Sequence, residues 1–245
     1  MAKRASRKRA DLLLVDLGLA ESREQAQTLI MEGLVFTSSG RVSKSSSLVP
    51  DTAALEIRGR LPYVSRGGLK LVHALDFFAL PVRDLVALDI GASTGGFTDC
   101  LLQRGARRVY AVDVGHGQLD YRLRADPRVD VMEKRNARYP FPLAEPVDLV
   151  TVDVSFISLA LVIPAALEHL KNGHFLVVLV KPQFEARREE VGRGGVIKDP
   201  QVHAGVLGRT IAWAVGRGLR VRNLCLSPIL GDAGNREFFL LLRKE

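Results

Sequence analysis

Four charged residues stand beside apolar segments that a sheet could bring together. Asp153 follows the apolar run VDLVTV, and Lys181 follows the run HFLVVLV. Glu237 directly precedes FFLLLR, and Lys70 lies in SRGGLK, at the start of a segment with helical spacing. Charged side chains next to buried strands need a partner or a chemical role, and paired amines and carboxylates can orient or transfer a proton. Lys70 could instead lie on a solvated helix face, and Glu237 could protect a sheet edge.

A glycine-rich turn provides a second candidate site. The segment ALDIGASTGGFTDCLL contains a strand, then Gly91, Gly95 and Gly96, then the start of a helix. Glycines there let the backbone turn sharply and let a ligand approach the helix N-terminus. Asp113 ends the next strand, where a carboxylate can accept hydrogen bonds from both ribose hydroxyls of an adenosine. The pattern indicates a site for NAD or S-adenosylmethionine, unless it is a plain strand-to-helix turn with Asp113 as a helix cap.

Two polar residues favour S-adenosylmethionine. Asp89 precedes the glycines and Asn136 follows the third strand, places that methyltransferases use for the methionine and adenine ends of the cofactor. Ser93 stands where many methyltransferases have another glycine, and Asn136 stands where an aspartate is common. Phe97 could pack near the cofactor or belong to the core.

The secondary-structure elements that must position these candidate residues form a regular pattern from Leu85 onward. Runs of Val, Leu and Ile alternate with helical segments, which is typical of a parallel sheet covered on both faces. We expect an α/β, doubly wound, mostly parallel seven-stranded Rossmann-like sheet whose last two strands form a hairpin at one edge. Residues 187–199 form a long polar loop of the kind that often covers a site.

The first 60 residues differ from the rest. A helix near 10–17, a second helix capped by Ser22 and ended by Gly33, and short strands around 34–37 and 53–57 predict a small α+β module. A Gly- and Pro-containing link follows. We therefore expect two domains, residues 1–60 and 61–245.

The composition narrows the class of partner. Lys+Arg 35 against Asp+Glu 27 gives a formal charge of +8, which favours nucleic acid first and an anionic membrane second. No apolar run approaches the roughly 20 residues that span a bilayer, and the N-terminal segment makes a poor signal peptide, so a cytoplasmic protein is expected.

Cys100 and Cys225 fit buried reduced thiols, and the five histidines have no ligand spacing, so no metal site is expected.

Several basic residues are candidate RNA contacts, although a solubilising arm would also account for the N-terminal run. The candidates are Lys3, Arg4, Arg7, Lys8 and Arg9 in that run, Arg23 and Lys44 in the small module, and Arg187, Arg188 and Arg193 in the long loop.

Residues 64–245 resemble the FtsJ-type ribose 2′-O-methyltransferases. The blocks VSRGGLKL, DIGASTGGFTD, VDVSFISL, VKPQFE and GNREFF resemble in particular the TlyA subfamily, long labelled hemolysins. The first 60 residues resemble a small RNA-binding module shared by a ribosomal protein, pseudouridine synthases and tyrosyl-tRNA synthetases. The resemblance implies S-adenosylmethionine-dependent 2′-O-methylation of ribose, in this family of a cytidine, in ribosomal RNA.

The resemblance also implies a catalytic Lys-Asp-Lys-Glu tetrad, carried onto Lys70, Asp153, Lys181 and Glu237. A ribose 2′-hydroxyl is a very weak acid, and Lys181 is the candidate base that takes its proton. Asp153 and Glu237 would orient that lysine, and Lys70 would steady the developing alkoxide. No metal is required.

Three other functions stay open at this point. A small-molecule O-methyltransferase would need neither the N-terminal module nor the positive balance. A membrane-active hemolysin is suggested by the older subfamily label but opposed by the lack of a spanning segment. A ribosome-assembly factor could keep the cofactor pocket without catalysis. The sequence carries no signal for the oligomeric state.

Overall fold

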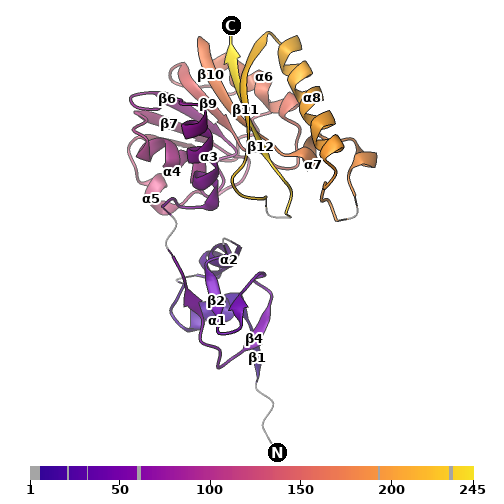
Figure 1. Ribbon diagram of the computed structural model, residues 1–245. Coiled ribbons are helices and arrows are strands. Elements are labelled where there is room, and N and C mark those ends of the chain that lie inside the picture. Colours follow the sequence, from indigo (N-terminus) through magenta and orange to yellow (C-terminus); the bar gives the residue numbers. More distant parts are fainter. Residues whose placement is uncertain (1–5, 21, 32, 60–61, 193, 232–233) are drawn as a thin grey trace, which may run out of the picture. The chain divides into compact units, whose positions relative to one another are not determined.

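The computed structural model describes residues 6–20, 22–31, 33–59, 62–192, 194–231 and 234–245. The chain divides into two compact units, Met1–Leu61 and Pro62–Glu245 (Figure 1). Each unit has its own apolar core.

The small unit combines two helices with short strands. Ser22 begins the second helix by accepting a hydrogen bond from the Gln25 N–H at 3.1 Å, and Gly33, with φ +72°, ends it. Leu14 and Ile30, one from each helix, pack in the same core as Val35. The elements are β1 (Arg7–Arg9), α1 (Ala10–Asp16), α2 (Arg23–Met31), β2 (Val35–Thr37), β3 (Gly40–Arg41), β4 (Leu48–Pro50) and β5 (Glu56–Ile57). β1 pairs with β4, and β2 pairs with both β3 and β5, always antiparallel.

The large unit contains a seven-stranded sheet in the order β11-β12-β10-β9-β6-β7-β8. Its strands are β6 (Val86–Ile90), β7 (Arg108–Val112), β8 (Val129–Met132), β9 (Val147–Val152), β10 (Leu170–Val180), β11 (Leu219–Leu226) and β12 (Phe238–Lys244). The pairs from β10 through to β8 are parallel, and β12 is antiparallel to both β10 and β11. The predicted fold class is confirmed, and the last strand is inserted between β10 and the edge strand β11.

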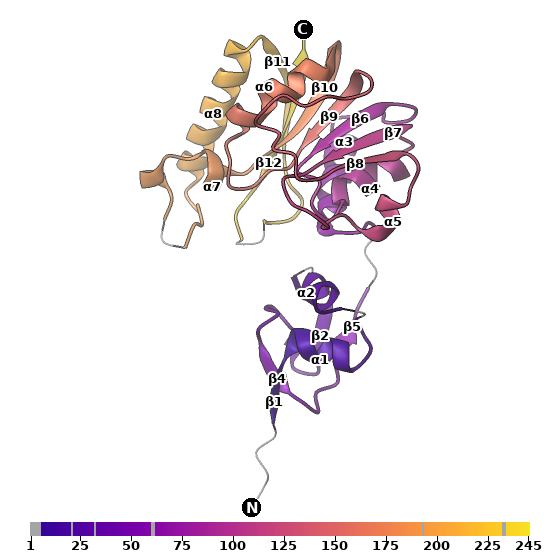
Figure 2. The ribbon, with the colours of Figure 1, turned by 180° about the vertical axis from the view of Figure 1, so that it is seen from behind.

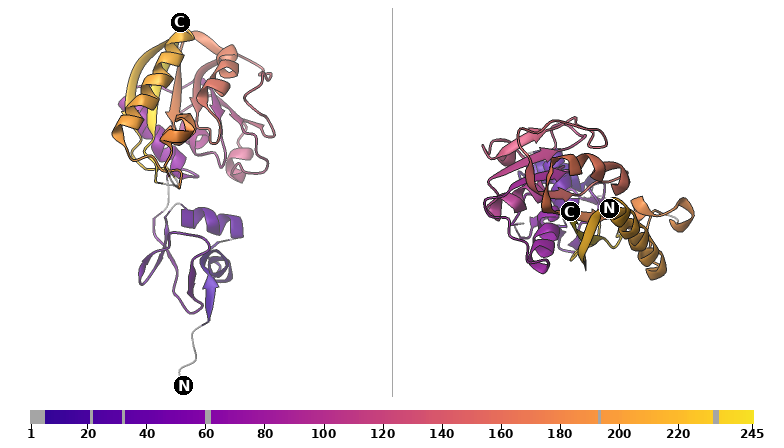
Figure 3. Two further views of the ribbon diagram at one scale, coloured as in Figure 1. Left: turned by 90° about the vertical axis from the view of Figure 1, so that its right-hand side faces the viewer. Right: turned by 90° about the horizontal axis from the view of Figure 1, so that it is seen from above.

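Helices cover both faces of this sheet (Figures 1 and 2). α3 (Arg66–Phe77), α4 (Gly96–Gln103) and the short α5 (Tyr121–Arg124) pack on one face, and α6 (Leu159–His169) and α8 (Pro200–Gly216) pack on the other. Successive side chains of β6 alternate accordingly: Ala87 faces the first layer, whereas Leu88 and Ile90 face the second. Figure 3 shows the sheet between its helices from two further directions.

Strand register brings the candidate catalytic residues to one edge of the sheet. Val152 of β9 pairs with Val178 of β10, and Val180 pairs with Phe238 of β12. Asp153, Lys181 and Glu237 each stand one residue beyond these strands, so all three leave the sheet at the carboxyl ends of the parallel strands. Ligands bind at this edge in open α/β sheets.

Two short elements follow β10: α7 (Pro182–Glu185) and the 3-10 helix η1 (Arg188–Glu190).

Cys100 and Cys225 are both buried and unbridged, and burial raises the pKa of the Cys100 thiol to about 12. Within the part of the chain that the structure describes, no helix is long and apolar enough to cross a membrane.

Candidate active site

The four predicted catalytic residues form two buried ion pairs. Nζ of Lys181 lies 2.5 Å from Oδ1 of Asp153 and donates a hydrogen bond to Oγ of Ser155 at 2.9 Å. Nζ of Lys70 donates to Oε2 of Glu237 at 2.6 Å. The Lys70 and Glu237 side chains are only 12% and 3% exposed, so Lys70 is not on a solvated helix face. Because β10 and β12 pair through Val180 and Phe238, the two ion pairs start from adjacent strand ends.

Close packing of glycines sets the position of Lys70 and Glu237. A Cβ on Gly96 would collide with Ser65, which caps α3, and would lie 2.9 Å from the Gly68 nitrogen, so α3 and α4 approach each other through glycine surfaces. A Cβ on Gly231 would collide with the carboxylate of Glu237. Gly96 and Gly231 need to be glycine because a neighbouring backbone and the Glu237 side chain occupy the space that a Cβ would fill.

A pocket of about 470 Å³ adjoins the Lys181–Asp153 pair. The predicted residues Gly91, Ser93, Asp113, Asn136 and Asp153 all lie on its wall. The wall also includes residues that were not predicted from the sequence, namely Val114, Gly115, Gln118, Arg135, Ser155 and Phe156. They lie on loops after strands, where no periodic pattern marks them.

The glycine turn fixes the floor of this pocket. Gly91 has φ +83°, and a Cβ there would collide with the carbonyl oxygen of Asp153. Ser93 adopts φ +49°, which is uncommon for a residue other than glycine, and its N–H donates to Oδ2 of Asp113 at 2.8 Å. The Gly115 N–H donates to Oδ1 of Asp113 at 2.7 Å. The Asp113 carboxylate is thus held in place at the pocket, and each oxygen keeps a lone pair that can accept a ribose hydroxyl.

Four residues predicted to contact the cofactor lie behind the pocket instead. Asp89 is completely buried and accepts hydrogen bonds from the Thr98 hydroxyl at 2.7 Å and the Thr151 hydroxyl at 2.9 Å. Burial raises the pKa of Asp89 to about 7. Phe97 packs in the core, with its ring 6.1 Å from the Phe239 ring.

Gly95 and Gly96 are buried in the turn, where Gly95 takes φ +97° with Leu123 packed against it. Asp89, Gly95, Gly96 and Phe97 therefore support the glycine turn from behind and do not line the pocket. The sequence pattern could not distinguish the two sides of a loop whose residues are only a few positions apart.

Asn136 reaches the pocket wall from the segment after β8. Its side-chain oxygen accepts a hydrogen bond from the Arg138 N–H at 3.0 Å, which closes a local turn. This turn places the Asn136 side-chain amide at the pocket. Asn136 therefore occupies the pocket position at which many methyltransferases have an aspartate.

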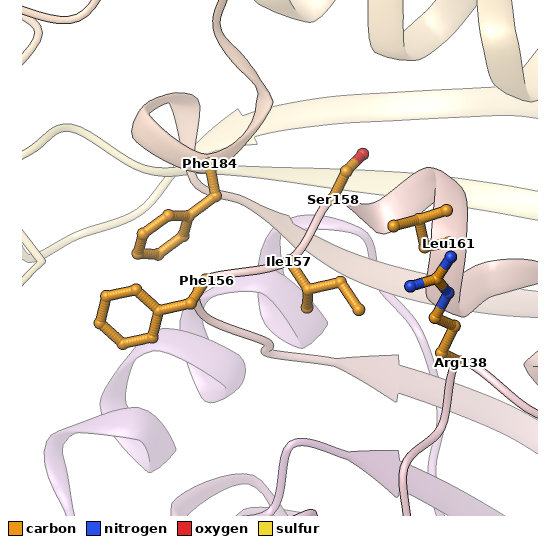
Figure 4. A pocket seen from close by; sticks show the side chains of 6 residues that line it. All are labelled: Arg138, Phe156, Ile157, Ser158, Leu161 and Phe184. Carbon is orange, nitrogen blue, oxygen red and sulfur yellow. The ribbon is translucent and has the colours of Figure 1, made fainter. Parts of the chain in front are cut away.

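A second pocket of about 490 Å³, with both polar and apolar side chains on its wall, shares Phe156 and Ile157 with the first (Figure 4). Phe156 is 91% exposed and takes φ +63°, and its ring centroid lies 5.0 Å from that of Phe184. Figure 4 shows these two rings beside each other, with Arg138 and Leu161 at the other end. Phe156 thus combines an exposed aromatic ring with an uncommon backbone conformation, while its partner Phe184 is half-buried.

The basic residues of the small unit are partly paired. Arg9 and Arg23 contact the buried carboxylate of Asp11 at 2.8 and 3.1 Å, and Lys8 pairs with Asp16. The Arg9 hydrogen bond holds the pKa of Asp11 well below its usual range.

The remaining candidate RNA contacts are either exposed side chains or residues that the structure does not describe. Arg7 and Lys44 are exposed, as are Arg187 and Arg188. Lys3, Arg4 and Arg193 lie outside the described residues.

The sheet order with its inserted antiparallel strand, the glycine turn after β6 and the acid after β7 define the class of Rossmann-like methyltransferases. Within that class the chain belongs to the FtsJ-like methyltransferase family, which matches residues 63–244. The predicted family is confirmed.

Relatives of the chain extend over both units. The 16S/23S rRNA (cytidine-2′-O)-methyltransferase TlyA of Mycobacterium tuberculosis (strain ATCC 25618 / H37Rv) is 46% identical and covers 100% of this chain and 92% of that protein. YqxC, a proposed rRNA methyltransferase of Bacillus subtilis (strain 168), is 48% identical over 97% of this chain and 86% of its own length. The solved structure of a proposed hemolysin from Streptococcus thermophilus is 46% identical with a TM-score of 0.77, covering 98% of this chain and 90% of that one.

Proposed function

We propose that this methyltransferase transfers a methyl group from S-adenosylmethionine to the 2′-oxygen of a cytidine ribose in ribosomal RNA. The observation that carries the proposal is the buried Lys181–Asp153 pair on the wall of the pocket, with Lys70–Glu237 starting from the neighbouring strand end. The names of the relatives support the RNA substrate and the ribose position.

The residues of the first pocket fit S-adenosylmethionine. Asp113 offers two fixed acceptor oxygens for ribose hydroxyls, Gly91 keeps the floor open next to Asp153, and Asn136 supplies an amide for the adenine end. The volume lies within the range of small-molecule sites. When bound, the cofactor supplies an electrophilic methyl group on a positively charged sulfur.

The tetrad prepares the ribose oxygen as a nucleophile. Lys181 serves as the base for the 2′-hydroxyl proton, and Asp153 at 2.5 Å stabilises the ammonium group that results. Ser155 accepts a hydrogen bond from Lys181 and so fixes the direction of its Nζ. Lys70, held by Glu237, donates toward the oxygen on which negative charge develops.

The second pocket suits the base of the target nucleotide. A nucleotide that is turned out of its RNA loses its base stacking, and aromatic side chains can replace that stacking. Phe156 and Phe184 offer such rings directly beside the Asp153 pocket, and exposed Arg138 is available for a phosphate.

The small unit is proposed to bind RNA through its exposed basic side chains, including Arg7 and Lys44. Its contacts would be to phosphates and RNA shape, because a folded ribosomal RNA presents few accessible base edges. A ribosomal RNA substrate places the protein in the cytoplasm.

The test replaces one lysine at each end of β10. Lys181→Ala should lower the rate of methyl transfer to ribosomal RNA by about 10²–10⁴-fold, the usual contribution of a general base. Lys171→Ala is the matched control, because Lys171 forms an ion pair with Asp148 at 2.6 Å at the opposite end of the same strand. That control should keep the rate within about twofold, since exposed ion pairs contribute little.

Mass-spectrometric mapping of ribosomal RNA identifies the product. Cells that lack the gene, or carry only Lys181→Ala, should lack one or more ribose methyl groups that the Lys171→Ala strain retains. Identical ribose methylation in all strains would refute the proposed activity. An RNA-binding factor without catalysis would give that result while still binding ribosomal RNA.

A further inference from the structure

Glu133 lies just beyond β8 and outside the wall of the cofactor pocket. Its side chain is only 10% exposed, although it directly follows the edge strand of the sheet. Figure 2 shows β8 and α5 at this edge. The loop of residues 113–120, between β7 and α5, supplies Val114, Gly115 and Gln118 to the pocket wall.

The Glu133 carboxylate holds this loop from behind. Its Oε1 accepts a hydrogen bond from the Gln118 N–H at 3.2 Å and one from the Arg124 guanidinium at 2.6 Å. Its Oε2 lies 3.2 Å from Nδ1 of His116. A backbone hydrogen bond from Gly117 contributes most to lowering the pKa of Glu133 to about 2, and Arg124 lowers it further. The loop is thus bonded to one carboxylate at several consecutive residues.

A second carboxylate holds the beginning of the same loop. Asp113 accepts from the Gly115 N–H, and the Lys134 N–H donates to the Gly115 carbonyl oxygen at 2.9 Å. Asp113 faces the pocket, whereas Glu133 does not line it. Gly117 has φ +68°, so without these bonds the middle of the loop has an easily varied backbone.

We propose that Glu133 is a positioning residue for the nucleoside end of the cofactor. It fixes the loop of residues 113–120 in its binding conformation before the cofactor binds, which lowers the entropy cost of ordering the loop on binding. The proposal rests on the proposed function in that the ligand is S-adenosylmethionine. It does not involve the tetrad, so it concerns cofactor affinity and not the chemical step.

The experiment compares three variants of the full-length protein by calorimetry with S-adenosylmethionine. Glu133→Gln should raise Kd about tenfold, equivalent to about 1.4 kcal/mol. Arg124→Ala should raise it by less than about threefold, because the loop hydrogen bonds to Glu133 remain. Glu145→Gln is the control: Glu145 also accepts from two arginines, Arg107 and Arg108, and stands just before β9, at the other end of the sheet from the pocket.

Two further readouts separate positioning from general loss of structure. In the cofactor-free Glu133→Gln protein, the amide protons of residues 115–119 should exchange faster, while those of β6 and β9 exchange as in the wild type. In steady-state kinetics, KM for the cofactor should rise while kcat at saturating cofactor stays unchanged.

Each outcome decides between the two proposals. Unchanged cofactor affinity in Glu133→Gln, with normal binding by the wild type, would overturn the role of Glu133 alone. Equal losses in Glu133→Gln and Arg124→Ala would also overturn it, because they would assign the effect to the ion pair with α5. Failure of the wild type to bind S-adenosylmethionine would overturn the proposed function itself.

Discussion

Two lysine–aspartate pairs join β9 to β10, and the two pairs differ in how far their lysine side chains are buried. Lys171 and Asp148 meet at 2.6 Å near the start of the strands, with the lysine side chain 44% exposed. Lys181 and Asp153 meet at 2.5 Å at the carboxyl ends, with the lysine 10% exposed. An exposed amine stays hydrated whatever its partner does, whereas a buried amine depends on its partner and can exchange a proton with a bound substrate. Only the second pair borders the pocket.

Asp89 makes stability depend on pH. Burial raises its pKa to about 7, although hydrogen bonds from Thr98 and Thr151 favour the charged form. Because the folded value lies above the unfolded value of about 4, the folded protein holds a proton that the unfolded chain releases between these values. The stability contributed by the protonated group is fully present below about pH 4 and is lost as the pH rises through 7.

Asp89→Asn removes this titration without changing the shape of the side chain. We expect the free energy of unfolding of the variant, relative to the wild type, to rise by about 4 kcal/mol between pH 4 and pH 9. Urea unfolding of both proteins at a series of pH values measures the difference. A difference that is constant with pH would show that Asp89 does not titrate in this range.

Single residues were predictable where their place along a strand fixed their place in the fold. Asp153 and Lys181 follow long apolar runs, and a parallel sheet brings such positions to one edge. The link between Lys70 and Glu237 came from the family resemblance, because no pattern in the sequence relates residues so far apart. Asp11 was missed, since an acid at the start of an amphipathic helix normally faces water.

At the scale of elements, long periodic segments were predictable and short ones were not. The helices and strands of the large unit follow apolar periods that the sequence displays. α5, α7 and η1 each have four residues or fewer, so tertiary contacts and caps decide them. The carboxylate of Glu185, on α7, accepts from the Ser158 hydroxyl and the Leu159 N–H at the start of α6. Local propensity contains no information about such a contact.

One buried amide connects the long polar loop to the loop that carries Glu237. Asn235 is almost completely buried, accepts from the Ile197 N–H at 2.8 Å and donates to the Gly195 carbonyl oxygen at 2.9 Å. Asn235 stands two positions before Glu237. Its hydrogen bonds therefore connect the loop near residues 194–197 to the segment that carries Glu237 of the Lys70–Glu237 pair.

Asn235→Ala should leave the buried Ile197 N–H and the half-buried Gly195 carbonyl oxygen without their present partners. We expect a loss of about 1–3 kcal/mol in the free energy of unfolding, together with faster amide exchange at Ile197 and a lower kcat. The Kd for S-adenosylmethionine should not change, because Asn235 is not on the cofactor pocket. Asn223→Ala, at an exposed position of β11, is the control. Wild-type exchange at Ile197 in the Asn235 variant would contradict the link.

At the scale of the whole molecule, the two units keep separate cores. Every buried residue of the small core lies between Ala10 and Leu55, and the two cores of the large unit use residues from Leu71 onward. The start of the large unit is bonded to its own α4, through the Pro62 carbonyl oxygen to Gln103 and the Val64 N–H to Asp99. Cofactor binding and catalysis are thus expected to reside in one unit, with RNA affinity shared between both.

A chain consisting of residues 62–245 tests this division. We expect it to fold and to bind S-adenosylmethionine with a Kd within about twofold of the full chain, because it keeps both of its cores and the whole pocket. Its affinity for ribosomal RNA should fall at least about tenfold, and the dependence of log K on log salt should become shallower, since each lost phosphate contact removes about one unit of slope. Calorimetry and RNA-binding titrations at several salt concentrations measure both quantities. Equal RNA affinity and an unchanged salt slope in the shortened chain would show that the small unit does not bind the substrate, whereas loss of cofactor binding would show that the pocket depends on both units.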